Sequence, residues 1–397
     1  MSERNRNVLS ANPRFRHLWV ARAVSFIGDG IALTALVLHV ESEHGTGTAV
    51  GALLLAQALP HLLGPVAGTF ADRVDQRRLM IGCDLGRAAV FTAAAVTLPD
   101  LGWLLVAMAT ASALDTLFGP AGRSAVPALV GPDDLVSANA WLGTALNMQV
   151  ALGPLFGGIL MGTLGIRGAL AVDAVTFVVS ALLLLRVPPL PPAPTAGPTR
   201  FWDELREGLA YVRSHPVARA VVLTLFLGVA FAGIDNVALV FLARTTLGAS
   251  PAVFGAIASA FGIGMLVASA SLSKRSELAS PRALFLGGWA MTGVGTLLTA
   301  ISPAAWFAVM AQAVSGAGNG ADNVASDTLI GSTVPREMLG RVFGLTSTAA
   351  FVGGGLAYAA GGPLLDATSA RTVFFIGAAG VFGVVALAGV MLPKGRA

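Results

Sequence analysis

Four aspartates lie inside long apolar runs of this sequence, where an ionised side chain is costly. They are Asp29, Asp115, Asp235 and Asp322, in the runs 16–40, 101–122, 217–243 and 303–325. A charge in the middle of a membrane span costs on the order of 3 kcal/mol on insertion scales, so such residues usually have a function. A carboxylate in a cavity of low dielectric can hold a proton near neutral pH and release it when water or a cationic ligand arrives. We therefore predict that these aspartates bind protons or substrate, and Asp29 is the first candidate because it stands in mid-span between two glycines.

Other ionisable residues in these runs admit more than one role. Asp322 stands near the end of its run, where a structural role is as reasonable as a functional one, and Asp115 could instead make an interhelical hydrogen bond. Asp84 and Arg87 are three residues apart and can satisfy each other on one helix face, which favours a structural pair. His61 could relay protons or serve as hydrogen-bonded scaffolding.

The composition decides what kind of element must position these residues. Of 397 residues, 55% are hydrophobic and 12% are charged, whereas an average soluble domain has about 25% charged residues. A membrane-spanning helix needs about 20 apolar residues. Twelve such runs occur, at 16–40, 48–70, 79–98, 101–122, 138–163, 168–187, 217–243, 251–273, 282–301, 303–325, 340–364 and 371–392. We predict an all-α integral membrane protein with twelve transmembrane helices.

The arginines predict its orientation. They gather at both ends of the chain and in alternate loops, while the opposite loops hold only Arg167, Arg244 and Arg371. Because cytoplasmic loops carry the excess of positive charge, both termini are predicted to be cytoplasmic, in a multi-pass protein of the plasma membrane.

A long central connection divides the chain. Residues 188–216 begin with a proline-rich segment and continue as FWDELREGLAYVRS, which predicts a stiff linker followed by a helix on the membrane interface. The segments on either side, 1–187 and 217–397, match at a constant offset of 203, for example at Gly45 and Gly248. This pattern predicts two six-helix bundles in a pseudo-twofold parallel repeat.

The end of the second run carries a motif. Residues 64–80 read GPVAGTFADRVDQRRLM, with Gly68, Asp72, Arg73, Arg77 and Arg78 in sequence. Together with the helix pattern, this resembles the signature of the major facilitator superfamily of secondary transporters. The D-R-x-D-x-R-R form is similar to the branch that contains macrolide-efflux proteins and enterobactin exporters. The resemblance implies that helices 1, 4, 7 and 10, which carry the four aspartates, line a central cavity.

The motif also has a physical interpretation. Gly64 and Gly68 form a smooth ridge that another helix can approach, and Asp72 continues the same face. A carboxylate there can cap the N-terminus of a helix of the other bundle, and the resemblance implies helix 11, which begins near Arg341. We predict a gate latch; the alternative is a solvated loop whose arginines only set the topology.

A second motif lies in the fifth run. Gly153, Pro154, Gly157 and Gly158 form G-P-x-x-G-G, which resembles the antiporter motif of drug exporters, although Gln149 replaces its leading glycine. Three glycines and a proline predict a kinked helix with a smooth face suited to sliding against the other bundle. Small residues also pack many membrane helices that do not move.

These observations predict a secondary transporter that exports small hydrophobic molecules or drugs in exchange for protons, by alternating access. Uptake or facilitated diffusion of a solute, and a non-transporting receptor or scaffold, are the alternatives. The sequence contains no phosphate-binding G-x-x-x-x-G-K-[ST] loop, no H-E-x-x-H motif and a single cysteine, Cys83. We therefore expect no enzyme activity, cofactor, metal or nucleic-acid partner. The expected partners are a small-molecule substrate, protons and the lipid bilayer, and the chain is expected to act as a monomer.

Overall fold

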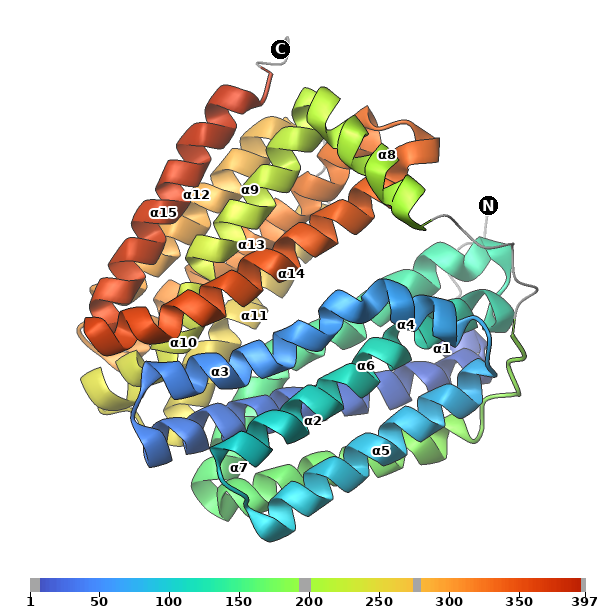
Figure 1. Cartoon of the computed structure of the whole chain (residues 1–397), viewed down its shortest axis with the longest axis horizontal. Helices are drawn as coiled ribbons and strands as arrows, with labels where there is room; N and C mark the ends of the chain where they lie inside the picture. Colours follow the sequence, from blue (N-terminus) through green and yellow to red (C-terminus); the bar gives the residue numbers. More distant parts are fainter. Residues whose placement is uncertain (1–7, 193–200, 274–279, 394–397) are drawn as a thin grey trace. The chain divides into compact units, whose positions relative to one another are not determined.

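Helices make up nearly all of the protein in a computed structural model that describes residues 8–192, 201–273 and 280–393 (Figure 1). The first half contains α1 (Val8–Ala11), α2 (Pro13–His44), α3 (Gly47–Ala58), η1 (Leu59–Leu63), α4 (Gly64–Ala71), α5 (Gln76–Thr97), α6 (Leu101–Leu129), η2 (Pro132–Asp134) and α7 (Leu135–Leu184). The second half contains α8 (Phe201–Ser214), α9 (Pro216–Ala232), α10 (Ile234–Phe241), η3 (Leu242–Thr246), α11 (Pro251–Ser273), α12 (Pro281–Ala300), α13 (Ala305–Thr333), α14 (Arg336–Ala367) and α15 (Ala370–Met391).

Polar side chains mark where several helices begin. The Asp75 carboxylate accepts from the Arg78 amide at the start of α5, and Asp100 accepts from the Trp103 amide at the start of α6. Ser280 caps α12 in the same way. Each cap satisfies an amide that has no partner inside its own helix, so these residues define the helix boundaries locally.

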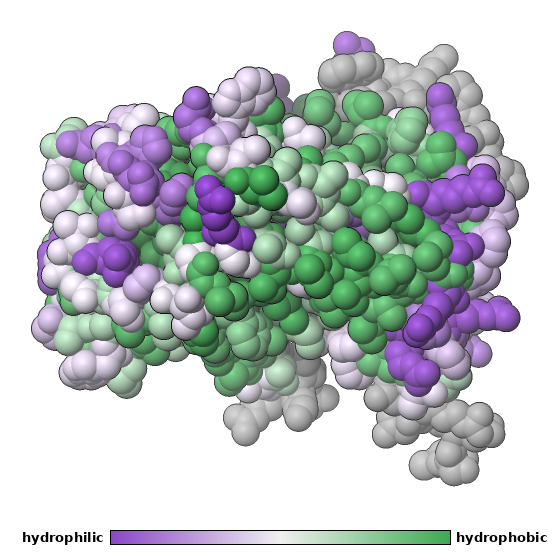
Figure 2. All heavy atoms as spheres, turned by 90° about the horizontal axis from the view of Figure 1, so that it is seen from below, coloured by the Kyte–Doolittle hydropathy of each residue, from purple (hydrophilic) through white to green (hydrophobic). Residues whose placement is uncertain are grey.

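The apolar helices have the lengths that a bilayer requires. Within the described residues, nine helical stretches are long and apolar enough to cross a membrane. One of them contains a kink that divides it in two, and α13 and the broken series α3–η1–α4 are further apolar segments. This arrangement is consistent with twelve crossings. On the face drawn in Figure 2, hydrophobic residues form a broad green region, and hydrophilic residues gather at its ends.

Glycine backbone conformations explain the kink and reflect the internal repeat. Gly165 has φ of +68° and breaks the helical backbone inside the stretch labelled α7, so the two predicted runs 138–163 and 168–187 are separate helices on either side of it. Gly45 and Gly248, which are 203 residues apart, have nearly equal φ values of +62° and +63°. Residues other than glycine rarely adopt this left-handed conformation. The repeat predicted from the sequence offset is therefore also a repeat of backbone conformation at this position.

The chain forms two compact units. Unit 1 contains the described residues of Met1–His39 and Ala56–Ala196, and unit 2 contains those of Val40–Leu55 and Gly197–Ala397. A short piece of the first half, the end of α2 and the start of α3, thus packs with the second half. Residues 201–214 of the predicted linker form helix α8 as expected, and residues 193–200 lie outside the described residues.

Candidate functional site

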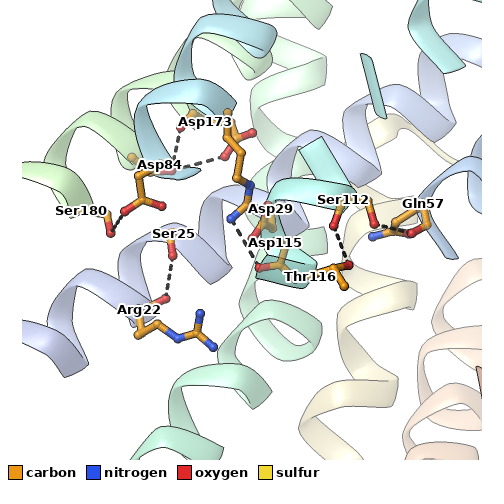
Figure 3. A network of polar contacts seen from close by, with 12 residues as sticks. Arg22, Ser25, Asp29, Gln57, Asp84, Ser112, Asp115, Thr116, Asp173 and Ser180 are labelled. Atoms are coloured by element: carbon orange, nitrogen blue, oxygen red, sulfur yellow. Dashed lines mark hydrogen bonds and ion pairs between the residues drawn. The ribbon is translucent and has the colours of Figure 1, made fainter. Parts of the chain in front are cut away.

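An arginine on α5 joins two of the predicted aspartates. Arg87 Nη2 contacts Asp29 Oδ1 on α2, and Arg87 Nη1 lies 3.5 Å from Asp115 Oδ1 on α6. The Arg87 side chain is only 4% exposed, and its guanidinium carbon lies 4.1 Å from the centre of the Phe177 ring. Figure 3 shows Asp29 and Asp115 close together in this region. Three helices therefore meet at one buried cation.

Asp115 also faces a histidine. His61 Nε2 lies 3.5 Å from Asp115 Oδ2, and His61 Nδ1 lies 3.1 Å from the carbonyl oxygen of Gln57. The Ser112 hydroxyl donates to that same carbonyl at 2.5 Å. Because acceptors face both ring nitrogens, a protonated imidazole could donate to both, and His61 is placed to pass a proton to or from Asp115.

Two further carboxylates lie deeper in unit 1. Asp84 Oδ2 accepts from the Ser180 hydroxyl at 2.6 Å, and Asp173 Oδ1 lies 3.3 Å from Thr176 Oγ1 (Figure 3). Both aspartates are completely buried. Asp84 Oδ1 and Asp173 Oδ2 have no hydrogen-bond partner within the described residues.

These contacts correct the predicted pairing of Asp84 with Arg87. Arg87 forms its ion pairs with Asp29 and Asp115 on neighbouring helices, while Asp84 bonds to Ser180 on α7. Asp173 was not among the residues predicted from the sequence. It could have been predicted, because it is a carboxylate inside the predicted apolar run 168–187.

These ionisable residues of unit 1 form one group, which we call the polar cluster. Its members are Arg22, Asp29, His61, Asp84, Arg87, Asp115 and Asp173. It contains four carboxylates and two guanidinium groups, and Arg87 forms ion pairs with two of the carboxylates, those of Asp29 and Asp115. The Arg22 guanidinium carbon lies 4.3 Å from the centre of the Phe26 ring and 4.6 Å from that of Phe118. An excess of buried negative charge is costly. Protons or a cationic ligand can compensate it, so the polar cluster is chemically suited to bind either.

The aspartates of unit 2 have different surroundings. Asp322 is 1% exposed, and its Oδ1 accepts from the Ser326 hydroxyl at 3.1 Å. Asp235 lies in the first turn of α10, directly after the break that separates α9 from α10. Among the residues that the structure describes, neither aspartate has an ion-pair partner. The structure thus brings Asp29 and Asp115 together within unit 1, while Asp235 and Asp322 belong to unit 2.

The residues of the predicted gate motif surround the turn between α4 and α5. Arg77 donates to the carbonyl oxygens of Leu184 and Leu185, at 3.1 and 2.6 Å, and so ties α5 to the end of α7. Asp72, Arg73 and Arg78 are exposed. A Cβ at Gly68 would meet nothing within 4 Å, so packing inside unit 1 does not require this glycine.

In unit 2, Arg341 Nη1 lies 2.6 Å from Glu207 Oε2 on α8. Arg341 therefore already has an acidic partner in its own unit. The predicted approach of Asp72 to the start of α14 stays a prediction.

The glycines of the predicted antiporter motif pack within their own unit. A Cβ at Gly153 would lie 2.5 Å from Gly30 Cα, and one at Gly157 would lie 2.9 Å from the Ile31 carbonyl oxygen. Their smooth face thus contacts α2, the helix that carries Asp29, whereas the sequence analysis assigned it to the other bundle. Pro154 lies inside α7 and Gly158 is buried.

The sequence matches a family model over almost its full length. The model describes a transmembrane secretion effector, and the match extends over residues 9–397. This chain belongs to that family, which is part of the major facilitator superfamily. The chain is therefore a multi-pass membrane transporter.

Curated relatives of this chain include exporters. The chain is 26% identical to the major facilitator transporter YfiS of Bacillus subtilis, over 90% of this chain and 88% of the relative. It is 23% identical to macrolide efflux protein A of Streptococcus pyogenes, over 84% and 85%. It is 24% identical to the enterobactin exporter EntS of Escherichia coli, over 86% and 82%.

Solved structures share the fold of this chain. The nucleoside transporter NupG superposes with a TM-score of 0.77 at 16% identity, covering 96% of this chain and all of the other. An inward-facing bacterial homologue of the iron transporter ferroportin gives a TM-score of 0.70 at 16% identity, over 96% and 98%. The predicted major facilitator fold is confirmed.

Proposed function

We propose that this transporter exports small, mostly hydrophobic molecules or drugs in exchange for protons, and that the polar cluster binds the protons. The observation that carries the proposal is the position of Arg87 between Asp29 and Asp115. Two relatives, a macrolide efflux protein and an enterobactin exporter, support the direction of transport.

The charges around Arg87 support competition between proton and substrate. Two ionised carboxylates beside one guanidinium leave an excess negative charge. A proton on Asp29 or Asp115 removes that excess, and so does a cationic group of a substrate. Because both ligands satisfy the same carboxylates, binding of one favours release of the other, which is the requirement for exchange.

His61 extends this scheme to proton delivery. Its Nε2 faces Asp115, and its Nδ1 lies near both Gln57 and Ser112. We assign to His61 the transfer of protons between Asp115 and water. Asp235 and Asp322 remain candidates for the part of the substrate site contributed by the second half.

Alternating access would use the two halves of the sequence, 1–187 and 217–397, as moving bundles joined by the linker 188–216. On this proposal both termini lie in the cytoplasm at the plasma membrane, and Asp72 with Arg341 forms part of a cytoplasmic gate. The close packing of Gly153 and Gly157 on α2 supports a role for their motif in positioning Asp29.

The test uses energised inside-out vesicles and a pH-sensitive dye. Macrolides, siderophores, nucleosides and sugars are added one class at a time to vesicles with the intact protein, an Asp29→Asn variant or an Asp133→Asn control, which changes an exposed aspartate of η2. We expect one class to alkalinise the interior with the intact and control proteins and not with Asp29→Asn.

Three results would contradict the proposal. Folded protein that responds to no class would exclude proton exchange with those compounds. Acidification on adding substrate would indicate transport in the same direction as protons. A full response from Asp29→Asn would remove Asp29 from the proton site.

A further inference from the structure

A carboxylate from α14 caps the N-terminus of α3. Asp366 Oδ1 accepts from the Gly47 amide at 2.5 Å, and Asp366 Oδ2 accepts from the Thr48 amide at 3.0 Å and from the Thr48 hydroxyl. The caps of α5, α6, α12 and α15 come from the residue that directly precedes each helix. At α3 the preceding Thr46 accepts from the Ala49 amide at 3.4 Å, and the Asp366 carboxylate adds a second cap from more than 300 residues away, so it fastens two separate elements together.

The two backbones also touch beside this cap. A Cβ at Gly47 would lie 2.7 Å from the Gly362 carbonyl oxygen, and one at Gly51 would lie 2.7 Å from the Tyr358 carbonyl oxygen. A Cβ at Gly362 would in turn lie 2.8 Å from Thr48 Cα. Glycines on both sides therefore let α3 and α14 approach closely, as small residues do between membrane helices.

A second tie lies at the end of α2. Glu41 Oε2 is 3.9 Å from Arg244 Nε, and the Thr245 hydroxyl donates to Glu41 Oε1 at 3.5 Å. We call all these contacts the α3–α14 seam; its members are Glu41, Gly47, Thr48, Gly51, Arg244, Thr245, Tyr358, Gly362 and Asp366.

The seam holds a piece of the first half against the second half. Val40–Leu55 packs in unit 2, although α2 continues without a break from unit 1 through His39 into Val40. The chain returns to unit 1 at Ala56, within α3. If the halves move against each other, either the seam parts or both helices bend at these junctions.

The contacts in the α3–α14 seam favour separation of the two elements over bending of the helices. Asp366 and Thr48 are exposed, so water can replace their hydrogen bonds when the elements separate. Gly51 and Gly362 face backbone atoms of the other helix, while Gly47 also lies against the buried side chain of Leu365, which must move away from it as the elements separate. The junction at His39, in contrast, lies inside the continuous helix α2 with no glycine or proline within four residues to ease bending, whereas the junction at Ala56 lies two residues before α3 ends and η1 with Pro60 begins.

We propose that Asp366 is a gate residue of transport. Its contact with the N-terminus of α3 closes the substrate path at the end of unit 2 opposite the C-terminus. This contact breaks once in each transport cycle. The inference rests on the alternating access of the proposed function. The sequence predicts a similar contact for Asp72, whose carboxylate at the end of α4 would cap the start of α14. In the proposed gate, the Asp366 carboxylate near the end of α14 caps the start of α3.

The experiment measures the accessibility of a reporter behind the seam. Leu55 lies two turns along α3 from Thr48 and faces α14, since a Cβ at Gly355 would lie 3.9 Å from Leu55 Cδ1. In a Cys83→Ser background, Leu55→Cys is labelled with a membrane-impermeant maleimide from the side opposite the termini. Asp366→Asn removes the charge, Thr48→Ala removes one partner, and Asp100→Asn is the control because it weakens only a local cap.

We expect labelling of Asp366→Asn to be faster by roughly tenfold, because losing charge-assisted hydrogen bonds shifts the population toward the open seam. Thr48→Ala should shift it in the same direction by less, and Asp100→Asn should have no effect. Unchanged labelling in both seam variants, or equal acceleration in Asp100→Asn, would overturn the gate. Labelling requires neither substrate nor protons, so failure of Asp29 as the proton site would leave this result intact.

Discussion

Arg87 on α5 forms a buried ion pair with Asp29 on α2, and the same guanidinium lies 3.5 Å from Asp115 on α6. This relationship ties a predicted functional aspartate to the stability of unit 1. Removing one partner of a buried ion pair leaves the other charge uncompensated.

Replacing Arg87 with alanine should therefore harm both stability and transport. We expect a loss of about 3 kcal/mol, the lower end of the cost of breaking a buried pair. Thermal unfolding in detergent and flux in vesicles measure the two effects. Arg78→Ala, which changes an exposed arginine of the same helix, should match the intact protein in thermal stability; an Arg87→Ala protein as stable as this control would disprove the pairing.

The role of His61 can be separated from that of Asp115. Asp115→Asn should abolish proton exchange, because it removes a charge that faces both Arg87 and His61. His61→Gln keeps a polar side chain but cannot relay a proton. It should slow proton uptake after a pH jump by roughly a hundredfold, the lower end of general acid–base effects. Proton uptake at the normal rate in His61→Gln would assign His61 to scaffolding.

The packing of α2 on α7 depends on glycines. Gly153→Ala places a methyl group against Gly30 Cα, so we expect destabilisation of about 1–3 kcal/mol, the usual cost of overpacking. Gly143→Ala is the matched control, because it lies on the same helix with nothing within 4 Å. The comparison is made by thermal unfolding. Equal melting temperatures for the two variants would show that α2 and α7 do not approach this closely.

Arg77 and Arg73, which follow α4, should differ in how their replacement by alanine affects stability. Arg77→Ala loses hydrogen bonds to two carbonyl oxygens at the end of α7 and should cost about 1.5–3 kcal/mol, the range for bonds to charged groups. Arg73→Ala changes an exposed side chain and should leave the melting temperature unchanged. On the gate hypothesis it should still slow transport. Normal flux in a folded Arg73→Ala protein would favour the solvated-loop alternative.

Much of the fold could be predicted because a bilayer restricts the backbone. Every amide in the hydrocarbon region must be bonded within the protein, so apolar runs of about 20 residues become helices. The sequence offset of 203 also identified Gly45 and Gly248 as equivalent positions, and both have the same left-handed backbone conformation. The runs at 138–163 and 168–187 were predicted as separate helices, and the non-helical backbone at Gly165 separates them.

The partners of the buried charges were decided by tertiary structure. Spacing along α5 favoured a pair between Asp84 and Arg87, yet Arg87 reaches Asp29 and Asp115 on two other helices. The glycines of the fifth run predicted that another helix packs closely against this segment. Only the tertiary structure identified that helix as α2.

The sequence by itself therefore determined the membrane class, the helices, the repeat and most of the residues that carry charge into the membrane. Each of these depends on hydropathy and local backbone preference, which are properties of a short segment. Tertiary structure decided that Arg87 serves Asp29 and Asp115, that Asp173 joins them in the polar cluster, and that Asp366 caps α3. These pairings depend on which helix faces lie against each other, because a buried charge is stabilised by the nearest partner in space, which need not be near in the chain.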